Sequence, residues 1–272
     1  MARVLGKVFL VGAGPGDPGL ITLKGKNCLE ASNVVLYDEL ANRELLSFAP
    51  VDAEFVYVGK RANGCSAIQG EIEAWLIREA YSGKIVVRLK GGDPFLFGRG
   101  GEEAQALAAA GIPFEVIPGI SSAFAVPAYA GIPVTHRNYS SSVAIVTGHK
   151  ASGDEVTWSA LIESVDTLII LMARQNLRKI MNRLLACGCD PARPCALIES
   201  GTLGDQSSVI GTVETLADLG EQSQMLGPTL IIVGEVVKLG RDLPWFYAAS
   251  RHLGPSSIAT GNESPRFAGQ AR

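Results

Sequence analysis

The stretch that decides the fold is KVFLVGAGPGD, residues 7–17. It begins with a short apolar run, Val8 to Val11, and continues into a turn that holds three glycines. A continuous apolar run that ends in glycines is typical of a buried strand in a parallel sheet. The segment therefore predicts the first strand of an α/β fold, with a tight turn at the strand's carboxyl end, where open α/β sheets bind ligands.

Strands and helices alternate after this turn. We expect helices where apolar residues recur at helical spacing and strands where apolar runs are short and continuous. The first half is predicted to hold strands at 33–38, 84–89 and 114–118, and helices at 21–32, 68–83, 102–111 and 121–131. A capping box, Ser66 with Gln69, is expected to start the helix at 68–83, and Gly83 to end it.

A second half begins near Asn138. Its predicted strands lie at 141–148, 166–173, 194–200, 207–213 and 229–237, and its helices at 157–164 and 176–188. The last two strands lack a long helix, so we expect part of this sheet to be antiparallel. We predict two α/β domains, 1–136 and 137–248, and a disordered tail at 249–272, which is polar and rich in Gly, Ser and Pro.

Composition sets limits on the function. The 272 residues carry 24 basic and 27 acidic side chains, a net charge of −3, so nothing global points to nucleic acid. No apolar run reaches the roughly 18 residues that suggest a membrane span. We interpret the apolar start as a strand rather than a signal peptide, because it leads directly into the glycine turn, and expect a cytoplasmic protein.

The five cysteines do not suggest a disulfide framework, since they are odd in number and sparse. They are Cys28, Cys65, Cys187, Cys189 and Cys195. The last three form a loose cluster whose spacing lacks the pairing typical of zinc sites. We therefore expect buried structural thiols and no metal.

The first turn imitates the fingerprint of a nucleotide-dependent dehydrogenase, G-x-G-x-x-G with an acid about 20 residues further on. Gly12, Gly14 and Asp38 fit that pattern, but Asp17 stands where the last glycine belongs. A carboxylate there would repel a pyrophosphate at the N-terminus of a helix. Pro15 also removes a backbone donor from the turn. These two residues disfavour the dehydrogenase hypothesis.

Three glycine clusters follow predicted strands: GAGPGD, KGGDP and PGISS. A single cluster is adequately explained by a tight turn, but three at strand ends favour a cradle in which a ligand approaches bare backbone. On this interpretation a side chain added at Gly91 would occupy the ligand's space and leave the fold intact. Asp93 is a candidate ligand contact or the start of an Asx turn before Pro94, and both roles can coexist.

Four longer motifs carry a resemblance to a known family. They are VGAGPGDPGLITLKG, VVRLKGGDPFLFGRGGEE, VIPGISSAFAVPAYAGIPVTHR and VAIVTGH. Together they resemble the tetrapyrrole methylase family, over about Lys7 to Leu239. RLKGGDPFLFGRGGEE combined with AGIPVTHR is similar to the branch that methylates uroporphyrinogen III. The resemblance implies two α/β domains with the active cleft between them, and a homodimer.

The resemblance also implies a reaction. S-adenosylmethionine would be the methyl donor and uroporphyrinogen III the acceptor, methylated at C2 and then C7 to give precorrin-2 and S-adenosylhomocysteine. The product would feed sirohaem or cobalamin synthesis. Two alternatives stay open: a methylase of a later corrinoid precursor, and a non-catalytic tetrapyrrole-binding protein.

Site residues follow from the same resemblance. The implied cofactor contacts are Pro15, Gly91, Gly92, Asp93, Leu96, Ser121, Ser122, Met172 and Gly201. Asp38 matches the proton acceptor and Lys60 the proton donor. The sequence departs from the family at Cys65–Ser66, where His-Ser is usual, and at Ser121–Ser122, where Thr-Ala is usual. From local sequence alone, Asp38 is nearly as good a cap for a helix over 39–48.

A polycarboxylate substrate requires cations in the cleft. Our candidates for substrate binding are Arg99, Arg61 and Lys90, which lie near predicted strand ends. Arg99 stands between glycines with no partner at helical spacing, which favours a functional role over a structural ion pair. Arg88, by contrast, is interpreted as a possible structural residue at a strand end.

Overall fold

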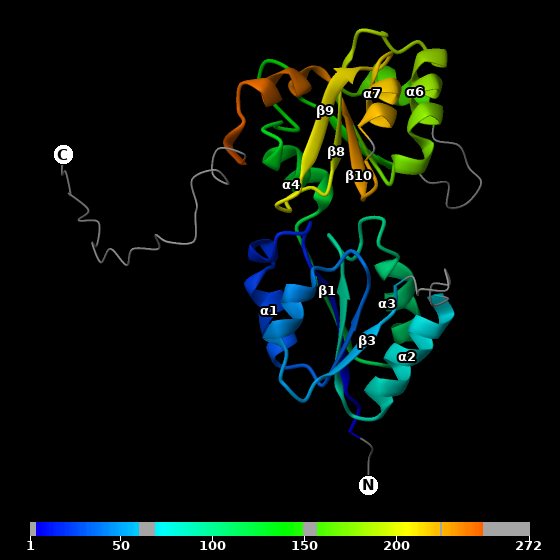
Figure 1. Ribbon diagram of the computed structural model, residues 1–272. Coiled ribbons are helices and arrows are strands. Elements are labelled where there is room, and N and C mark those ends of the chain that lie inside the picture. Colours follow the sequence, from blue (N-terminus) through cyan, green and yellow to red (C-terminus); the bar gives the residue numbers. More distant parts are fainter. Residues whose placement is uncertain (1–3, 60–68, 149–156, 224, 247–272) are drawn as a thin grey trace, which may run out of the picture.

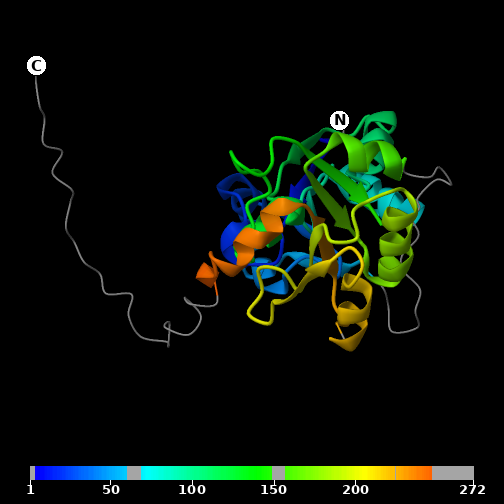
Figure 2. The same cartoon turned by 90° about the horizontal axis from the view of Figure 1, so that it is seen from above.

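A computed structural model describes residues 4–59, 69–148, 157–223 and 225–246. It contains two five-stranded sheets, one in each half of the chain, and each has helices packed on both faces. Figure 1 shows the two halves stacked end to end, with the N-terminal half below. From above, the second sheet and its helices lie in front of the first (Figure 2). The predicted α/β class with two sheets is confirmed.

The first sheet is parallel throughout and has the order β3-β2-β4-β1-β5. Its strands are β1 (Lys7–Gly12), β2 (Val34–Tyr37), β3 (Glu54–Tyr57), β4 (Ile85–Lys90) and β5 (Phe114–Ile117). The sequence pattern did not predict β3. It is an edge strand in which Glu54 and Phe55 are exposed and only Val56 is buried, so it shows no apolar run.

Helices cover this sheet on both faces. On one face, α2 (Gln69–Tyr81) and α3 (Gly100–Ala109) pack over Val8, Leu10, Val34 and Val86. On the other face, α1 (Leu23–Glu30) and the 3-10 helix η2 (Arg43–Phe48) pack over Val11, Val35, Val87 and Leu89. Successive residues of β4 thus face opposite helical layers, as the two-residue period of a strand requires. Figure 1 shows α1 on one side of the sheet and α2 and α3 on the other.

The second sheet is mixed, with the order β6-β7-β10-β8-β9. Its strands are β6 (Val143–Thr147), β7 (Thr167–Leu171), β8 (Pro194–Glu199), β9 (Ser207–Thr212) and β10 (Thr229–Val233). Only β6 and β7 pair in parallel, and the remaining pairs are antiparallel. The predicted antiparallel character is confirmed. The short connection between β8 and β9 allows nothing else, because a parallel crossover needs a dozen or more residues.

Two helical layers enclose the second sheet. One layer holds α5 (Trp158–Ser164), α6 (Leu177–Ala186) and α7 (Leu216–Gln222). The other holds α4 (Ser122–Tyr129) and the 3-10 helix η4 (Glu235–Arg241). Ala123 and Val126 of α4 lie in the same buried cluster as Ile169 and Ile232. Although α4 precedes the boundary predicted at residues 136 and 137, it packs on the second sheet, and the boundary itself stays a prediction.

Two cysteines of the second half, Cys189 and Cys195, are buried as the sequence predicts. Cys195 is fully buried in the core of the second half, and burial raises the pKa of its thiol. Cys189 is also buried there, whereas Cys187 is only half-buried.

Among the residues described, no helix is both long and apolar enough to cross a bilayer. Ser66, Cys65 and the predicted tail lie outside the described residues.

Candidate active site

The three glycine turns meet because they follow three adjacent strands, β4, β1 and β5. The backbones of Gly14 and Gly92 exchange two hydrogen bonds, with N···O distances of 2.7 and 3.2 Å. A Cβ added to Gly12 would lie 2.5 Å from the Cα of Gly119, and one added to Gly119 would lie 2.3 Å from the Gly92 carbonyl oxygen. Gly12 and Gly119 are therefore required for contact between the turns rather than for contact with a ligand.

Gly91 and Gly92 have different surroundings. A Cβ on Gly91 would lie 2.6 Å from the Cβ of Leu40, so its missing side chain faces the turn after β2. The expectation that a side chain at Gly91 would enter ligand space is wrong. Within the described part of the chain, the one atom within 4 Å of a Cβ on Gly92 would be the backbone nitrogen of Ser122, at 3.9 Å. Gly92 also has a φ of +67°, and among the glycines of the three turns it has the most room for an added Cβ.

Asp93 holds the second turn in shape. Its Oδ1 accepts a hydrogen bond from the Phe95 N–H at 2.8 Å, which makes an Asx turn, and its Oδ2 accepts from the Gly119 N–H at 3.1 Å. One carboxylate thus ties the turn after β4 to the turn after β5. The Asx turn expected as a structural role of Asp93 is therefore present, and both carboxylate oxygens accept hydrogen bonds from backbone N–H groups.

Backbone strain is concentrated where the two halves face each other. Among the described residues, five that are not glycine have positive φ: Phe97, Arg99, Met172, Ser200 and Thr202. The first two lie in the loop after β4, and the other three follow β7 and β8 of the second sheet. Residues held in this sparsely populated region cluster at ligand sites in many proteins. The outliers therefore mark the facing loops as the candidate site.

Asp17 joins the two halves. Its N–H donates to Thr202 Oγ1 at 3.0 Å, and its Oδ2 accepts from the Tyr129 hydroxyl at 2.8 Å. Its Oδ1 caps the 3-10 helix η1 (Pro18–Leu20) by accepting from Gly19 N–H. Burial, followed by the hydrogen bond to Asp17, raises the pKa of Tyr129 to about 12. The acid that argued against a pyrophosphate is thus an anchor between the halves.

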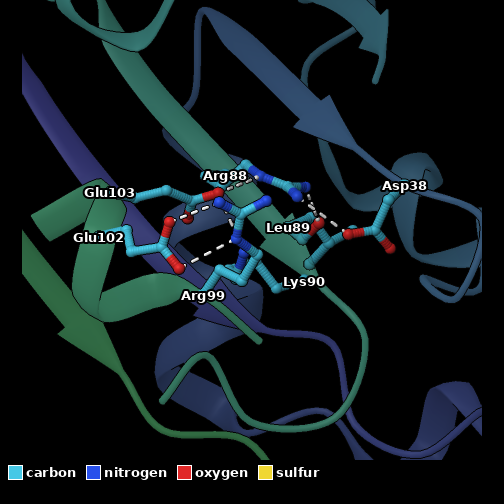
Figure 3. Close-up of polar contacts among 7 residues, drawn as sticks. All are labelled: Asp38, Arg88, Leu89, Lys90, Arg99, Glu102 and Glu103. Atoms are coloured by element: carbon cyan, nitrogen blue, oxygen red, sulfur yellow. Dashed lines mark hydrogen bonds and ion pairs between the residues drawn. The ribbon is translucent and has the colours of Figure 1, made fainter. Parts of the chain in front are cut away.

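Asp38 lies at the end of β2 beside a buried ion cluster (Figure 3). Its Oδ2 accepts from the Arg88 guanidinium at 3.0 Å, and its Oδ1 accepts from the Leu40 N–H at 3.2 Å. The alternative role as a helix cap is wrong, since Asn42 caps η2 by accepting from the Glu44 N–H. Asp38 keeps about a quarter of its side chain exposed, which leaves it accessible.

Lys90 is not a surface cation. Its side chain is 4% exposed, and its ammonium lies 3.0 Å from Glu103 Oε1. Burial, followed by the nearby Arg88 cation, lowers the pKa of Lys90. A buried lysine already paired with a carboxylate cannot reach a propionate without breaking that pair. The structure therefore argues against Lys90 as a substrate-binding residue.

Arg99 has a partner that the sequence interpretation missed. Because α3 begins at Gly100, two residues before its predicted start, Glu102 lies in the first turn and three positions after Arg99. The guanidinium donates to both Glu102 oxygens, at 3.0 and 2.5 Å (Figure 3). The expectation of no partner at helical spacing is wrong. More than half of the Arg99 side chain is nevertheless exposed, so the cation still faces solvent.

Comparison with known proteins identifies the family to which the chain belongs. The family model described as Tetrapyrrole (Corrin/Porphyrin) Methylases matches residues 7–217. The chain belongs to the tetrapyrrole methylase family. This confirms the family expected from the sequence motifs.

Named relatives of this tetrapyrrole methylase cover most of its chain. A uroporphyrinogen-III C-methyltransferase of Priestia megaterium is 52% identical over 86% of the chain and 99% of the relative. A siroheme synthase of Baumannia cicadellinicola is 51% identical over 89% of the chain but only 52% of the relative, so the chain spans about half of that protein. The uroporphyrin-III C-methyltransferase of Thermus thermophilus, solved in complex with S-adenyl homocysteine, is 40% identical with a TM-score of 0.74. That comparison covers 86% of the present chain and all of the other.

Of the other predicted residues of this tetrapyrrole methylase, some make structural contacts and some lie outside the described part of the chain. Ser121 caps α4 by accepting from the Ala123 N–H, and Leu96 packs on the core of the second half. Gly201 lies against α4, since an added Cβ would lie 2.3 Å from Val126 Cγ2. Lys60 and Arg61 lie outside the described residues.

Two residues of the site were not predicted at all. Glu103 is fully buried and binds both Arg88 and Lys90, and Thr202 is a buried hydroxyl that binds Asp17. A signal for Glu103 was present, because Arg88 and Lys90 are two apart in a strand and must share one face. Two cations on a buried face require a buried carboxylate. No comparable signal marked Thr202.

Proposed function

We propose that this tetrapyrrole methylase transfers methyl groups from S-adenosylmethionine to uroporphyrinogen III, at C2 and C7, to give precorrin-2. Support comes from family membership, from the names of relatives that align over nearly their whole length, and from the Thermus thermophilus complex. The single observation in this chain that carries the proposal is the bare backbone of Gly92, which has the most room for a ligand among the glycines of the three converging turns.

The residues present fit the methyl donor. Gly92 leaves room for a ligand against backbone, and Met172 is an exposed apolar side chain, 47% accessible, in a strained conformation after β7. We propose that Pro15, Gly91, Gly92, Leu96, Ser122, Met172 and Gly201 contact the cofactor, with Asp93 and Ser121 holding the loops in shape. Gly91 and Gly201 would do so through backbone atoms alone, since an added Cβ at either would meet protein. When bound, the cofactor supplies an activated methyl group, so the protein needs no covalent nucleophile. The chain's task is positioning and the exclusion of competing acceptors.

We propose Asp38 as the acceptor of the proton that leaves the macrocycle. It is a partly exposed carboxylate at the carboxyl edge of the first sheet, and one of its oxygens is fixed by Arg88. A base must be within hydrogen-bond reach of the proton it removes, and a fixed carboxylate meets that need better than a mobile one. Lys60 remains the proposed proton donor, and Arg99 and Arg61 the proposed contacts to substrate carboxylates.

The cellular setting is also part of the proposal. We propose a cytoplasmic homodimer that feeds sirohaem or cobalamin synthesis. Free thiols at Cys28, Cys187, Cys189 and Cys195 are typical of a reducing compartment. Phe95, Phe97 and Phe124 are between 43% and 58% exposed, and interfaces commonly bury aromatic side chains of this kind. Light scattering across a range of protein concentrations tests the dimer.

A labelled-methyl assay tests the reaction. Purified protein, methyl-labelled S-adenosylmethionine and uroporphyrinogen III should give a doubly methylated product and free S-adenosylhomocysteine. Asp38→Asn should lose methyl transfer yet bind S-adenosylhomocysteine normally. Asp52→Asn should behave as wild type, because Asp52 is an exposed acid that precedes β3 and so lies at the opposite edge of the sheet from Asp38. Tight binding of uroporphyrinogen III without cofactor binding, measured by calorimetry, would favour a non-catalytic tetrapyrrole-binding protein. Methyl transfer to a later corrinoid precursor alone would favour the other alternative.

A further inference from the structure

Glu103 is a buried carboxylate whose side chain does not reach the surface. It lies in the first turn of α3 and has no exposed side-chain area. Its Oε1 accepts from Arg88 Nε at 3.2 Å and from Lys90 Nζ at 3.0 Å. Within the described residues, its Oε2 is buried and has no hydrogen-bond partner. The position near the N-terminus of a helix favours a negative charge, but it does not require one to be buried.

Arg88 connects Glu103 to Asp38. Its guanidinium uses three separate nitrogens: Nε to Glu103, Nη1 to the Leu89 carbonyl oxygen at 2.9 Å, and Nη2 to Asp38 Oδ2 at 3.0 Å. A guanidinium is planar and rigid, so fixing two of its nitrogens fixes the direction of the third. Figure 3 shows Arg88 between the two carboxylates, with Glu103 and Asp38 on opposite sides.

We propose that Glu103 is a positioning residue for Asp38, acting through the guanidinium of Arg88. The inference rests on the proposed function, because it assigns a purpose to the base of that reaction. Asp38 extends from the end of β2, and among the described residues its carboxylate accepts one backbone N–H, from Leu40. The orientation of its carboxylate plane therefore depends on Arg88, and the orientation of Arg88 depends on Glu103.

A purely stabilising role explains the cluster less well. Removing two charges from water costs several kcal/mol per ion, and apolar replacements of buried ion pairs are often equally stable or more so. The unpartnered Oε2 increases that cost. The cluster is therefore a poor means of stabilising the fold. Because it ends at Asp38, the candidate base, a role in positioning explains it better.

Substitution of Glu103 by Gln tests the inference, because glutamine keeps the shape and removes the charge. Glu79→Gln is the matched control: Glu79 is also a buried helical glutamate, 9% exposed, paired with Arg78 and Lys84 away from Asp38. We expect kcat of Glu103→Gln to fall roughly tenfold or more, with the Kd for S-adenosylhomocysteine within about twofold of wild type. Glu79→Gln should keep wild-type kcat whatever its melting temperature.

A double-mutant cycle separates positioning from general damage. If Glu103 acts through Asp38, adding Glu103→Gln to Asp38→Asn should not lower the residual kcat further. If Glu103→Gln fails to fold, the double variant Glu103→Gln/Lys90→Met removes both members of one ion pair and should show the same loss of kcat. Wild-type kcat in the variant that folds, or equal losses in Glu103→Gln and Glu79→Gln, would overturn the inference. An inactive wild-type protein would instead refute the proposed function.

Discussion

The backbone N–H of Asp17 donates to the hydroxyl of Thr202, 185 positions further along the chain. The bond links the turn after β1 with the strained loop after β8, and Thr202 is itself positioned by Gln206, whose Oε1 accepts from the Thr202 N–H at 2.7 Å. Pro15 and Gly201, two of the proposed cofactor contacts, flank the two ends of this bond. The two halves of the site are therefore held in register by a direct contact between loops.

The Thr202 hydroxyl should be needed for both stability and cofactor affinity. Thr202→Ala leaves the Asp17 N–H without its acceptor and should lower the free energy of unfolding by about 1–2 kcal/mol. The Kd for S-adenosylhomocysteine should rise about fivefold, as a positional loss of about 1 kcal/mol implies. Thr202→Ser retains the hydroxyl and should match wild type in urea unfolding and calorimetry. Equal behaviour of the Ala and Ser variants would contradict the role of the hydroxyl.

The hydrogen bond from Tyr129 to Asp17 should stabilise the fold by an amount that decreases at alkaline pH. The pKa of Tyr129 is raised from 10.0 to about 12, so its stabilising effect is present below pH 10 and is lost as the pH rises toward 12. Tyr129→Phe should therefore cost about 1 kcal/mol near pH 8, and the difference from wild type should shrink above pH 10. Tyr81→Phe, which removes a hydroxyl bound to the Ala110 carbonyl oxygen, is the control. A difference that is constant between pH 8 and 11 would argue against the assignment.

A methyl group at Gly92 should block the cofactor. Gly92→Ala places a Cβ 3.9 Å from the backbone nitrogen of Ser122, where it fits the protein but would occupy space proposed for the ligand. The variant should raise the Kd for S-adenosylhomocysteine about tenfold or more. Gly111→Ala is matched for strain, because Gly111 has the same φ of +67° and nothing within 4 Å of an added Cβ. Both variants should lose about 1–2 kcal/mol of stability, but only Gly92→Ala should lose affinity. Similar affinities in the two would show that the space beside Gly92 is not used.

Gly91→Ala should show the opposite pattern. Its Cβ would overlap Leu40, so the variant should lose about 1–3 kcal/mol of stability from overpacking. The molecules that remain folded should bind S-adenosylhomocysteine with nearly wild-type affinity. Thermal melting and calorimetry on the same sample distinguish this from Gly92→Ala.

Removal of the exposed cation at Arg99 should affect the acceptor and not the donor. Arg99→Met should raise KM for uroporphyrinogen III about tenfold, as loss of a charge-assisted hydrogen bond implies, and leave the Kd for S-adenosylhomocysteine unchanged. Arg178→Met is the control, since Arg178 is also exposed and paired with two carboxylates, on the far helices α6 and α7. An unchanged KM would remove Arg99 from the substrate site.

Much of the fold could be predicted because its signals are local. Apolar runs that end in glycine marked β1 and β4, and the lack of a long helix beside β9 and β10 indicated the antiparallel part, although the short helix α7 lies between these two strands. The adjacency of β4, β1 and β5 could not be predicted, since the order of strands depends on packing between distant segments. That adjacency makes the difference between three separate glycine turns and one shared site.

The errors within the site have the same origin. Gly91 and Gly92 are neighbours with identical side chains, and only the position of Leu40, fixed by a different turn, distinguishes them. Arg99 was interpreted as unpaired because the start of α3 was placed two residues late, which removed Glu102 from helical spacing. Lys90 was counted as a surface cation because its partner comes from a helix that follows it.

The place of β10 between β7 and β8 has a consequence for synthesis of the chain. Once residue 117 has left the ribosome, every strand of the first sheet is present and that sheet can close. The second sheet lacks its middle strand until residue 233 has emerged, and α4 has no completed surface to dock on until then. While residues 118–233 are being added, a nascent chain thus carries a finished lower half and an open upper one. In this interval a chaperone or a partner can reach the unpaired edges of β7 and β8.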